Sequence, residues 1–301
     1  MRYPFEAVGV FGTSGGGGSP LAVVHDAEGL GMAEMGRIAE RLRADEVVFV
    51  LPPTEPEATH RVRVFNRAGE SPFGGHSAVG TAVALVRSGR LPAGRLVQQC
   101  GARLLELRAD ERHATITATD PLPSEELQPA PLLDAVGLTA DDLGDGPPLA
   151  AGFGPRFHLL PVRKPALGAL RADPAALREH GLPDLFVFHW DEAARTATAR
   201  LFAPGYAIEE DPACASVGLA LAVWLRGRRE SPAGDLRFEI RQGAEVGRPS
   251  VLGCALVDDG KRPFTATVSG AAPQELAGEL EVPALLGPGR GPGPALSDRS
   301  R

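Results

Sequence analysis

Two segments far apart in this chain have the same design, and they constrain its fold more than any other feature. "PFGGHSAVG" (residues 72–80) and "DPACASVG" (residues 211–218) each place a turn directly before an apolar run of small residues. A similar tripeptide precedes each segment, Arg63-Val64-Phe65 in one case and Arg200-Leu201-Phe202 in the other, at an offset of about 137 residues. A repeat at this spacing predicts an internal duplication.

The elements expected around these segments form two similar halves. Residues 1–125 have strand patterns at "YPFEAVGVF", "LAVVHDA", "EVVFVLPP", "HRVRVFN", "RLLELRA" and "HATITAT", and helix patterns at "GMAEMGRIAERLR" and "SAVGTAVALVRSG". Residues 126–286 have strand patterns at "PRFHLLPV", "DLFVFHW", "ATARLFAP", "PSVLGCALV" and "FTATVSG", and helix patterns at "PAALREHGL" and within "EEDPACASVGLALAVWLRG". The sequence therefore predicts an α+β fold of two halves, in which the last strand of the second half can pack on the first. The Gly/Pro-rich residues 287–301 are expected to form a disordered tail.

Composition limits the classes of partner. The chain has 301 residues, a formal net charge of −7 and 43% hydrophobic residues, which is ordinary for a globular protein. An acidic chain lacks the basic face that nucleic acid requires, so no nucleic-acid partner is expected. No run of about 18 apolar residues predicts a membrane span, and no secretory leader is recognised at the start. Three scattered cysteines favour a reducing cytoplasm without a disulfide framework.

The two turns predict an anion site. A turn that enters a buried helix presents unpaired backbone N–H groups and the positive end of the helix dipole. Glycines let a ligand approach that backbone closely, and a carboxylate is the kind of group that such a place attracts. Two such helices that face each other across a cleft would hold one small anionic substrate, with His76 supplied by one half and Asp211 by the other.

Five segments, in order, resemble the PhzF family of isomerases and epimerase-like proteins, which share the diaminopimelate epimerase fold. They are "GSPLAVVHDAEGL", "MGRIAERLRADEVVFV", "RVFNRAGESPFGGHSAVGTA", "ARLFAPGYAIEEDPACAS" and "RQGAEVGRPS", and the resemblance spans roughly Ala7 to Gly270. It implies two similar halves, each a curved mixed sheet around a central helix, with the active site in the cleft between them. It also implies proton-transfer chemistry without a cofactor or metal, and a homodimer.

The resemblance places the family's catalytic groups on three residues of this chain. Its glutamate falls on Glu46, its histidine on His76 and its aspartate on Asp211. A partly desolvated carboxylate can take a proton from carbon and return it, and the histidine and aspartate can handle a second proton or hold a substrate amine or hydroxyl. The expected substrate-binding residues lie at the two turns and in the glycine-rich turn before the second strand: Gly74, Gly75, Ser77, Ser19, Cys214, Ala215 and Ser216.

Four departures from the family's pattern border this presumed pocket. The family's Gly-Asn-Pro is Gly-Ser-Pro at Ser19, an early aspartate is replaced by Gly9, and a proline after Gly-His is replaced by Ser77. After Asp-Pro-Ala the family usually has Thr-Gly-Ser, whereas this chain has Cys214-Ala215-Ser216. The family's best-known substrate is a dihydro-hydroxyanthranilate of phenazine synthesis. These changes favour a different substrate, in another pathway of secondary metabolism.

Other chemistries fit the sequence less well. "GTSGG" (residues 12–16) matches the G-x-S-x-G nucleophile elbow, but no helix follows the serine directly. The same glycines lack the Lys-Ser/Thr of a phosphate loop, and the histidines and cysteines show no metal-ligand spacing. A two-thiol racemase needs one cysteine from each half, whereas Gly74 stands opposite Cys214.

Two hypotheses of different classes follow. One is an isomerase that moves a proton along a small unsaturated or amino or hydroxy acid. The other is a non-catalytic protein that keeps the cleft as a metabolite-binding site. Retention of Glu46, His76 and Asp211 together favours the enzyme, and the altered Cys214-Ala215 turn favours the binding protein.

Overall fold

A computed structural model describes residues 1–42, 44–67, 69–71, 74–229, 234–260 and 264–282. The expected tail at residues 287–301 lies outside the described residues. Among the residues described, no helix is both long and apolar enough to cross a membrane.

The first half consists of strands around one buried helix. Its elements are β1 (Arg2–Val10), β2 (Ser19–Val24), α1 (Met32–Leu42), β3 (Glu46–Leu51), β4 (His60–Asn66), β5 (Gly69–Ser71), α2 (Gly75–Arg87), β6 (Gly94–Cys100), β7 (Arg103–Ala109) and β8 (His113–Thr119). Helix α2 is buried over all but its last residue, because its side chains are small or apolar on every face. Helix α1 has the single apolar stripe of a surface helix, and it covers the outer face of the sheet with Met35 and Ile38.

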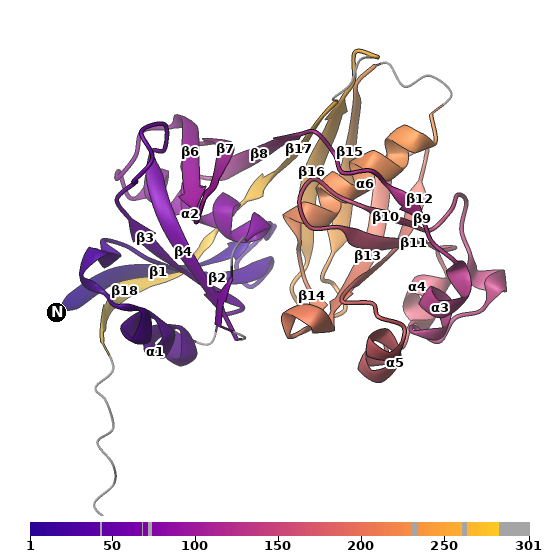
Figure 1. Ribbon diagram of the computed structural model, residues 1–301, viewed down its shortest axis with the longest axis horizontal. Coiled ribbons are helices and arrows are strands. Elements are labelled where there is room, and N and C mark those ends of the chain that lie inside the picture. Colours follow the sequence, from indigo (N-terminus) through magenta and orange to yellow (C-terminus); the bar gives the residue numbers. More distant parts are fainter. Residues whose placement is uncertain (43, 68, 72–73, 230–233, 261–263, 283–301) are drawn as a thin grey trace, which may run out of the picture.

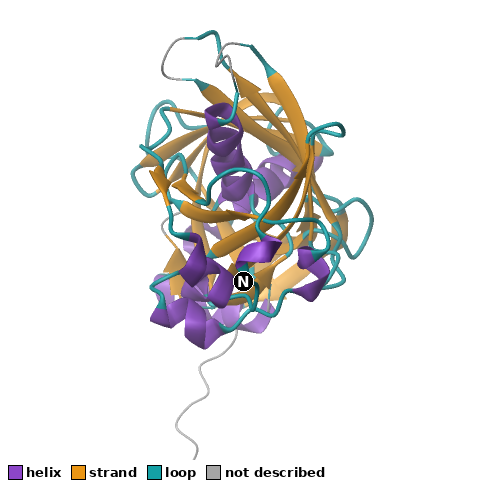
Figure 2. Cartoon of the chain, turned by 90° about the vertical axis from the view of Figure 1, so that its right-hand side faces the viewer, coloured by secondary structure: helices purple, strands orange, loops and turns teal. Residues whose placement is uncertain are grey.

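The second half repeats this order with short helices in place of α1. After β9 (Glu125–Glu126) and α3 (Pro129–Asp134) come β10 (Leu149–Ala151), β11 (Phe157–Pro161), α4 (Ala166–Ala169), α5 (Pro174–Glu179), β12 (Leu185–Asp191), β13 (Thr196–Ala203), β14 (Ile208–Asp211), α6 (Ala215–Gly227), β15 (Leu236–Gln242), β16 (Ser250–Val257), β17 (Thr265–Ala271) and β18 (Gln274–Glu281). Figure 2, which faces this half, shows a helix enclosed by strands and short helices outside the sheet.

Strand pairing is the same in the two halves. The parallel pairs β2–β3 and β4–β6 correspond to β11–β12 and β13–β15, and the antiparallel hairpin β3–β4 corresponds to β12–β13. The offset is 137 residues between Arg63 and Arg200, but it is 140 between Gly74 and Cys214, the residues that precede α2 and α6. The difference arises because a single turn of 3-10 helix at Pro204–Tyr206 lengthens the connection from β13 to β14. This agreement of topology and register identifies the two halves as copies of one unit.

The halves exchange strands where they meet (Figure 1). Strand β8 pairs with β17 over seven residue pairs, from Thr119–Thr265 to His113–Ala271. Strand β18 follows the second half in the chain but pairs with β1, and β9 follows the first half but pairs with β10. The last described strand thus lies in the first half.

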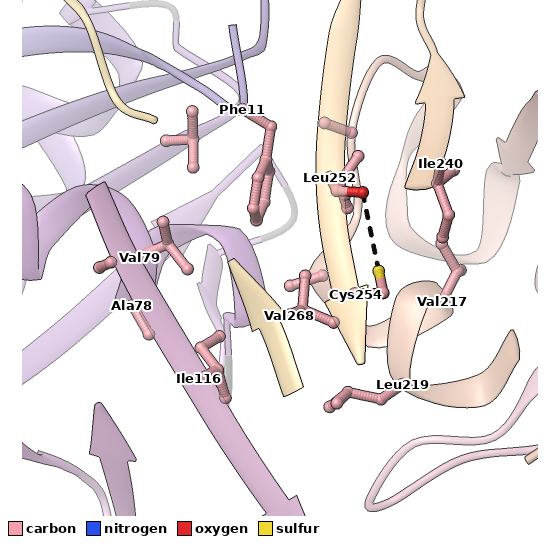
Figure 3. Close-up of a cluster of buried hydrophobic side chains, with 14 of the residues drawn as sticks. Phe11, Ala78, Val79, Ile116, Val217, Leu219, Ile240, Leu252, Cys254 and Val268 are labelled. Carbon is pink, nitrogen blue, oxygen red and sulfur yellow. Dashed lines mark hydrogen bonds between the residues drawn. The ribbon is translucent and has the colours of Figure 1, made fainter. Parts of the chain in front are cut away.

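One hydrophobic core runs through both halves (Figure 3). Gly80 of α2 and Gly218 of α6 let each helix approach its sheet, because a Cβ at Gly218 would lie 2.8 Å from a methyl of Val268 and a Cβ at Gly80 would overlap Leu21. Val268 of β17 lies between the side chains that surround α2 and those that surround α6, and it belongs to the shared core. Burial of this continuous apolar surface joins the halves into one unit.

Candidate active site

The two buried helices begin next to each other. Helix α2 starts at Gly75, two residues before the helix pattern that begins at Ser77, and α6 starts at Ala215, within the segment in which the second buried helix was expected. A Cβ on Gly75 would lie 2.9 Å from Oγ of Ser216, so only glycine leaves room between the two helix starts. Neither helix has a side-chain cap, and the N–H groups of both first turns lack intrahelical partners. Two positive helix ends therefore meet at one place.

A cavity of about 470 Å³ opens beside these helix starts, and both halves contribute to its walls. The described residues that line it include Glu46, Asn66, Glu70, Gly74, Gly75, His76, Arg103, Phe157, Tyr206, Asp211, Cys214 and Ser216. The structure thus brings together the three residues that the sequence singled out for catalysis.

Glu46 and His76 face each other in this cavity. Glu46 is the first residue of β3 and His76 the second residue of α2, and both side chains are almost fully buried. Oε2 of Glu46 lies 3.3 Å from Nε2 of His76, yet neither atom makes a hydrogen bond. A Cβ at Gly74 would lie 2.8 Å from the same carboxylate oxygen, so glycine at this position makes room for Glu46. The two atoms are left available to a ligand.

Asp211 enters the cavity from the other half, at the end of β14. Its Oδ1 accepts a hydrogen bond from the backbone N–H of Ala213 at 2.9 Å, and its backbone carbonyl accepts one from Nε2 of Gln242 at 2.5 Å. Burial raises the pKa of Asp211 to about 6, against the opposing effects of the His76 charge and the Ala213 N–H. Asp211 can therefore change its charge near neutral pH.

Cys214 also lines the cavity, directly before α6. Burial, and next the neighbouring charge of Asp211, raise the pKa of this thiol, so it remains protonated. The equivalent position before α2 is Gly74, which has no thiol. The pair of facing cysteines that a two-thiol racemase needs is absent at these two positions.

Three of the residues expected to bind substrate lie elsewhere. Ser19, the first residue of β2, is buried and lines no part of the cavity. Ser77 donates its hydroxyl to the carbonyl of Gly74 at 2.9 Å, which closes the first turn of α2. Ala215 lines a neighbouring cavity instead.

Sequence reasoning missed several residues that line the cavity. Arg103 and Phe157 come from segments with no local motif, and they reach the cavity only because β7 and the second half fold toward it. Tyr206 lies in a segment that resembles the family, but nothing in that segment singled it out. Glu70 could have been found from the sequence, because the pair Arg63 and Glu70 of the first half is repeated by Arg200 and Glu210 of the second. In the structure both pairs form ion pairs, at 2.6 Å and 2.7 Å. In the described part of the chain, no group of three or more His, Cys, Asp or Glu residues could hold a metal ion.

Comparisons with known proteins agree with the two-half fold. A family model described as "Phenazine biosynthesis-like protein" matches residues 8–278. The chain is 34% identical over 257 residues to a trans-2,3-dihydro-3-hydroxyanthranilate isomerase of Pseudomonas aeruginosa, covering 84% of this chain and 90% of that protein. Among solved structures, a PhzF-family protein of Bacillus anthracis superposes with a TM-score of 0.83 at 21% identity, covering 94% of this chain and all of that one. A predicted epimerase of Pseudomonas aeruginosa has a TM-score of 0.75 at 26% identity over 92% of this chain and 99% of its own.

Proposed function

The chain belongs to the phenazine biosynthesis-like family of isomerases, and from that premise we propose that it moves a proton on a small carboxylate-bearing metabolite by general acid–base catalysis without a cofactor. One observation carries the proposal: Glu46, His76 and Asp211, from both halves of the chain, line one cavity at the start of two buried helices. The helix ends attract the substrate carboxylate, and the three side chains supply and accept protons.

Each proposed step is assigned to a side chain that lines the cavity. The Glu46 carboxylate takes a proton from a substrate carbon, the electron pair of that C–H bond shifts along the unsaturated system, and a proton is delivered at another carbon. Glu46 can return that proton, or His76, 3.3 Å from it, can take part in the delivery. The substrate gains and loses one proton and no electrons. The reaction therefore needs no electron acceptor.

The relative's name and the departures of this chain indicate different substrates. The name of the Pseudomonas aeruginosa relative makes trans-2,3-dihydro-3-hydroxyanthranilate the first compound to assay. The Cys214-Ala215 turn, at the start of α6, departs from the family's pattern, so we expect another small acid of secondary metabolism to be the better substrate. A homodimer and a cytoplasmic location stay predictions, and sedimentation at several concentrations tests the first of them.

The proposal is tested by following deuterium in heavy water. The parent enzyme should place solvent deuterium in the product, because a carboxylate in an open cavity exchanges its proton with water. Glu46→Gln keeps the shape of the side chain and should lower turnover about 10²–10⁴-fold while thermal stability stays close to that of the parent.

Asp45→Asn is the matched control, because Asp45 adjoins Glu46 in the chain and is half-buried but does not line the cavity. It should change turnover by less than about threefold, the size expected of a nearby charge rather than of a reacting group. If acids bind to the parent but no deuterium is exchanged, the protein is a metabolite-binding member of the family instead. A Gln variant that turns over near the parent rate would remove Glu46 from the mechanism.

A further inference from the structure

A second cavity, of about 370 Å³, adjoins the candidate active site. Gly75, Arg103, Gly154, Pro155 and Ser216 line both cavities. Two of these residues lie in the first turns of α2 and α6. A carboxylate bound at the helix starts therefore faces Glu46 on one side and the second cavity on the other.

The walls of the second cavity are mainly apolar, and both halves supply them. Leu104, Leu105, Ile116 and Ala118 come from β7 and β8, Phe153 comes from the connection after β10, and Leu219 comes from α6. Leu104 is 44% exposed although it lines a cavity between the halves. Apolar side chains left open to water in a concave site are typical of a ligand-binding pocket.

Rigid contacts hold this wall in place. The ring of Phe153 packs edge-on against Phe264, with the ring centroids 5.7 Å apart, and the guanidinium of Arg226 covers the other ring at 4.9 Å from its centroid. Leu219 belongs to the shared core, and Ala118 lies opposite Ala266 of β17. Phe153 and Leu219 therefore belong to a preformed surface.

Arg103 stands where the two cavities join. A Cβ on Gly154 would lie 3.4 Å from an amino nitrogen of Arg103, an ordinary contact distance, so the guanidinium lies directly beside Gly154 at this junction. Its positive charge adds to the attraction that the helix starts exert on a carboxylate.

We propose that the second cavity is a subsite for an apolar extension of the substrate, so that the natural substrate carries, beyond the acid-bearing part held beside Glu46, a further ring or short hydrocarbon chain that extends past Arg103. This inference rests on the proposed function, because it takes the substrate carboxylate to lie at the helix starts. It narrows the substrate class from small acids in general to acids with an apolar extension.

The experiment compares two carboxylates by titration calorimetry. Benzoate is short enough to lie at the helix starts beside Glu46 without entering the second cavity. 4-Phenylbutanoate adds an apolar extension that can reach the second cavity. The parent should bind 4-phenylbutanoate at least about tenfold more tightly than benzoate, since its additional apolar carbons are removed from water in the second cavity. Ala118→Phe fills the second cavity and should remove that advantage while the affinity for benzoate is kept.

Two further variants complete the test. Ala255→Phe adds the same ring to another half-buried strand alanine that lines neither cavity, and it should keep the tenfold preference. Leu104→Ser changes an exposed position, so it folds even where Ala118→Phe does not. It should weaken the binding of 4-phenylbutanoate several-fold and leave the affinity for benzoate unchanged.

Equal affinity of the parent for the two acids, or a preference that survives both cavity variants, overturns the subsite but not the anion site. If the parent binds neither acid, the anion site of the proposed function fails, and the subsite fails with it.

Discussion

Glu46 and Asp211 are two carboxylates that line one cavity, and their surroundings give them different properties. The Glu46 carboxylate faces His76 across 3.3 Å. Asp211 is 5% exposed, and burial raises its pKa to about 6. A folded protein that holds an aspartate in this way loses stability when that aspartate ionises.

The sign and size of this effect follow from linkage. Below the ordinary pKa of 3.8, Asp211 is protonated in both the folded and the unfolded chain, and its burial does not lower the free energy of unfolding through ionisation. As the pH rises from there through about 6, the unfolded chain ionises first, and the free energy of unfolding falls. The full loss is on the order of 3 kcal/mol, because each pKa unit corresponds to about 1.36 kcal/mol.

Asp211→Asn should therefore stabilise the protein at pH 8 and have little effect at pH 4. The amide oxygen of asparagine can still accept the hydrogen bond from Ala213, so the turn before α6 is kept. Urea unfolding of parent and variant at both pH values measures the difference. Asp145→Asn, at an exposed position, is the control and should shift neither curve by more than about 0.5 kcal/mol. An Asn variant that is less stable than the parent at pH 8 would contradict the burial argument.

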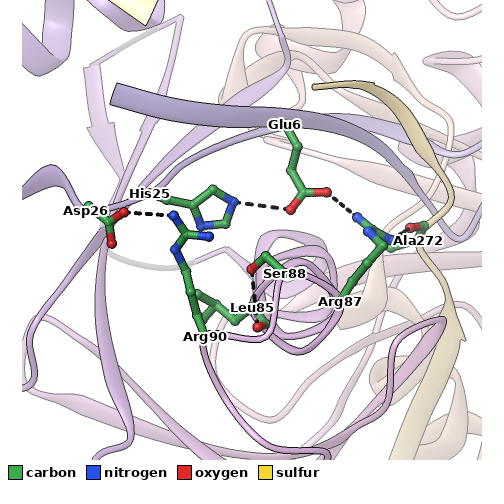
Figure 4. Close-up of polar contacts among 8 residues, drawn as sticks. All are labelled: Glu6, His25, Asp26, Leu85, Arg87, Ser88, Arg90 and Ala272. Carbon is green, nitrogen blue, oxygen red and sulfur yellow. Dashed lines mark hydrogen bonds and ion pairs between the residues drawn. The ribbon is translucent and has the colours of Figure 1, made fainter. Parts of the chain in front are cut away.

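At the scale of elements, a buried ionic cluster anchors the C-terminal end of α2 (Figure 4). Glu6 of β1 accepts a hydrogen bond from Arg87, the last residue of α2, and lies 3.2 Å from Nε2 of His25. Arg87 also donates to the carbonyl of Ala272, between β17 and β18, at 2.9 Å. This cluster connects α2 to strands from both ends of the chain, and it lies at the opposite end of the helix from the candidate active site.

Glu6→Gln should lower the free energy of unfolding by about 1.5–3 kcal/mol at pH 7, because it removes the charge that Arg87 pairs with in a buried place. Burial acts to raise the pKa of Glu6, but the hydrogen bonds from His25 and Arg87 outweigh it, and the pKa lies below its ordinary value. The stabilisation by Glu6 is thus present above pH 4.5 and is lost as the pH falls through the folded pKa.

Denaturant unfolding at pH 7 and at pH 3 checks this difference. Glu106→Gln removes a carboxylate from an ion pair with Arg95 on the surface, where both side chains are more than half exposed, and it should cost less than about 1 kcal/mol. An equal loss for the two variants at pH 7 would show that the cluster at the end of α2 contributes no more than a surface pair.

At the scale of the whole molecule, the two halves are linked by strand exchange and by one core. β8 pairs with β17, β18 pairs with β1, and Val268 belongs to the apolar cluster that contains both central helices. Neither half can complete its sheet and bury its apolar surface without strands from the other.

The chain should therefore unfold in a single cooperative transition. Both tryptophans, Trp190 and Trp224, lie in the second half, so their fluorescence reports that half, whereas far-ultraviolet circular dichroism reports the whole chain. The two unfolding curves in urea should coincide. A fluorescence transition separated from the dichroism transition would show that the halves unfold independently.

Much of this architecture could be predicted from the sequence, because its determinants are local. Turns before apolar helices, together with alternating strands in the same order, predicted two similar α+β halves, and the resemblance of five segments predicted the family that the comparisons show. Glu46, His76 and Asp211 could be named because each lies in a segment that resembles the family's pattern. Strand β6 was missed, since Gln98 and Gln99 break its apolar pattern and find their partners, His60 and Thr54, in distant segments.

The tertiary structure alone decided what depends on contacts between distant segments. The pairing of β18 with β1, the placement of Ser19 outside the cavity, and the arrival of Arg103 and Tyr206 at its walls all depend on how the halves pack. The need for glycine at position 75 also depends on a distant segment, because the atom that leaves no room for a side chain there is Oγ of Ser216, on the other helix. A residue's own neighbours in the chain favour a helix or a strand there, although β6 also depends on partners in distant segments. Which residue of the other half a residue meets is determined by the burial of apolar surface shared between the two halves.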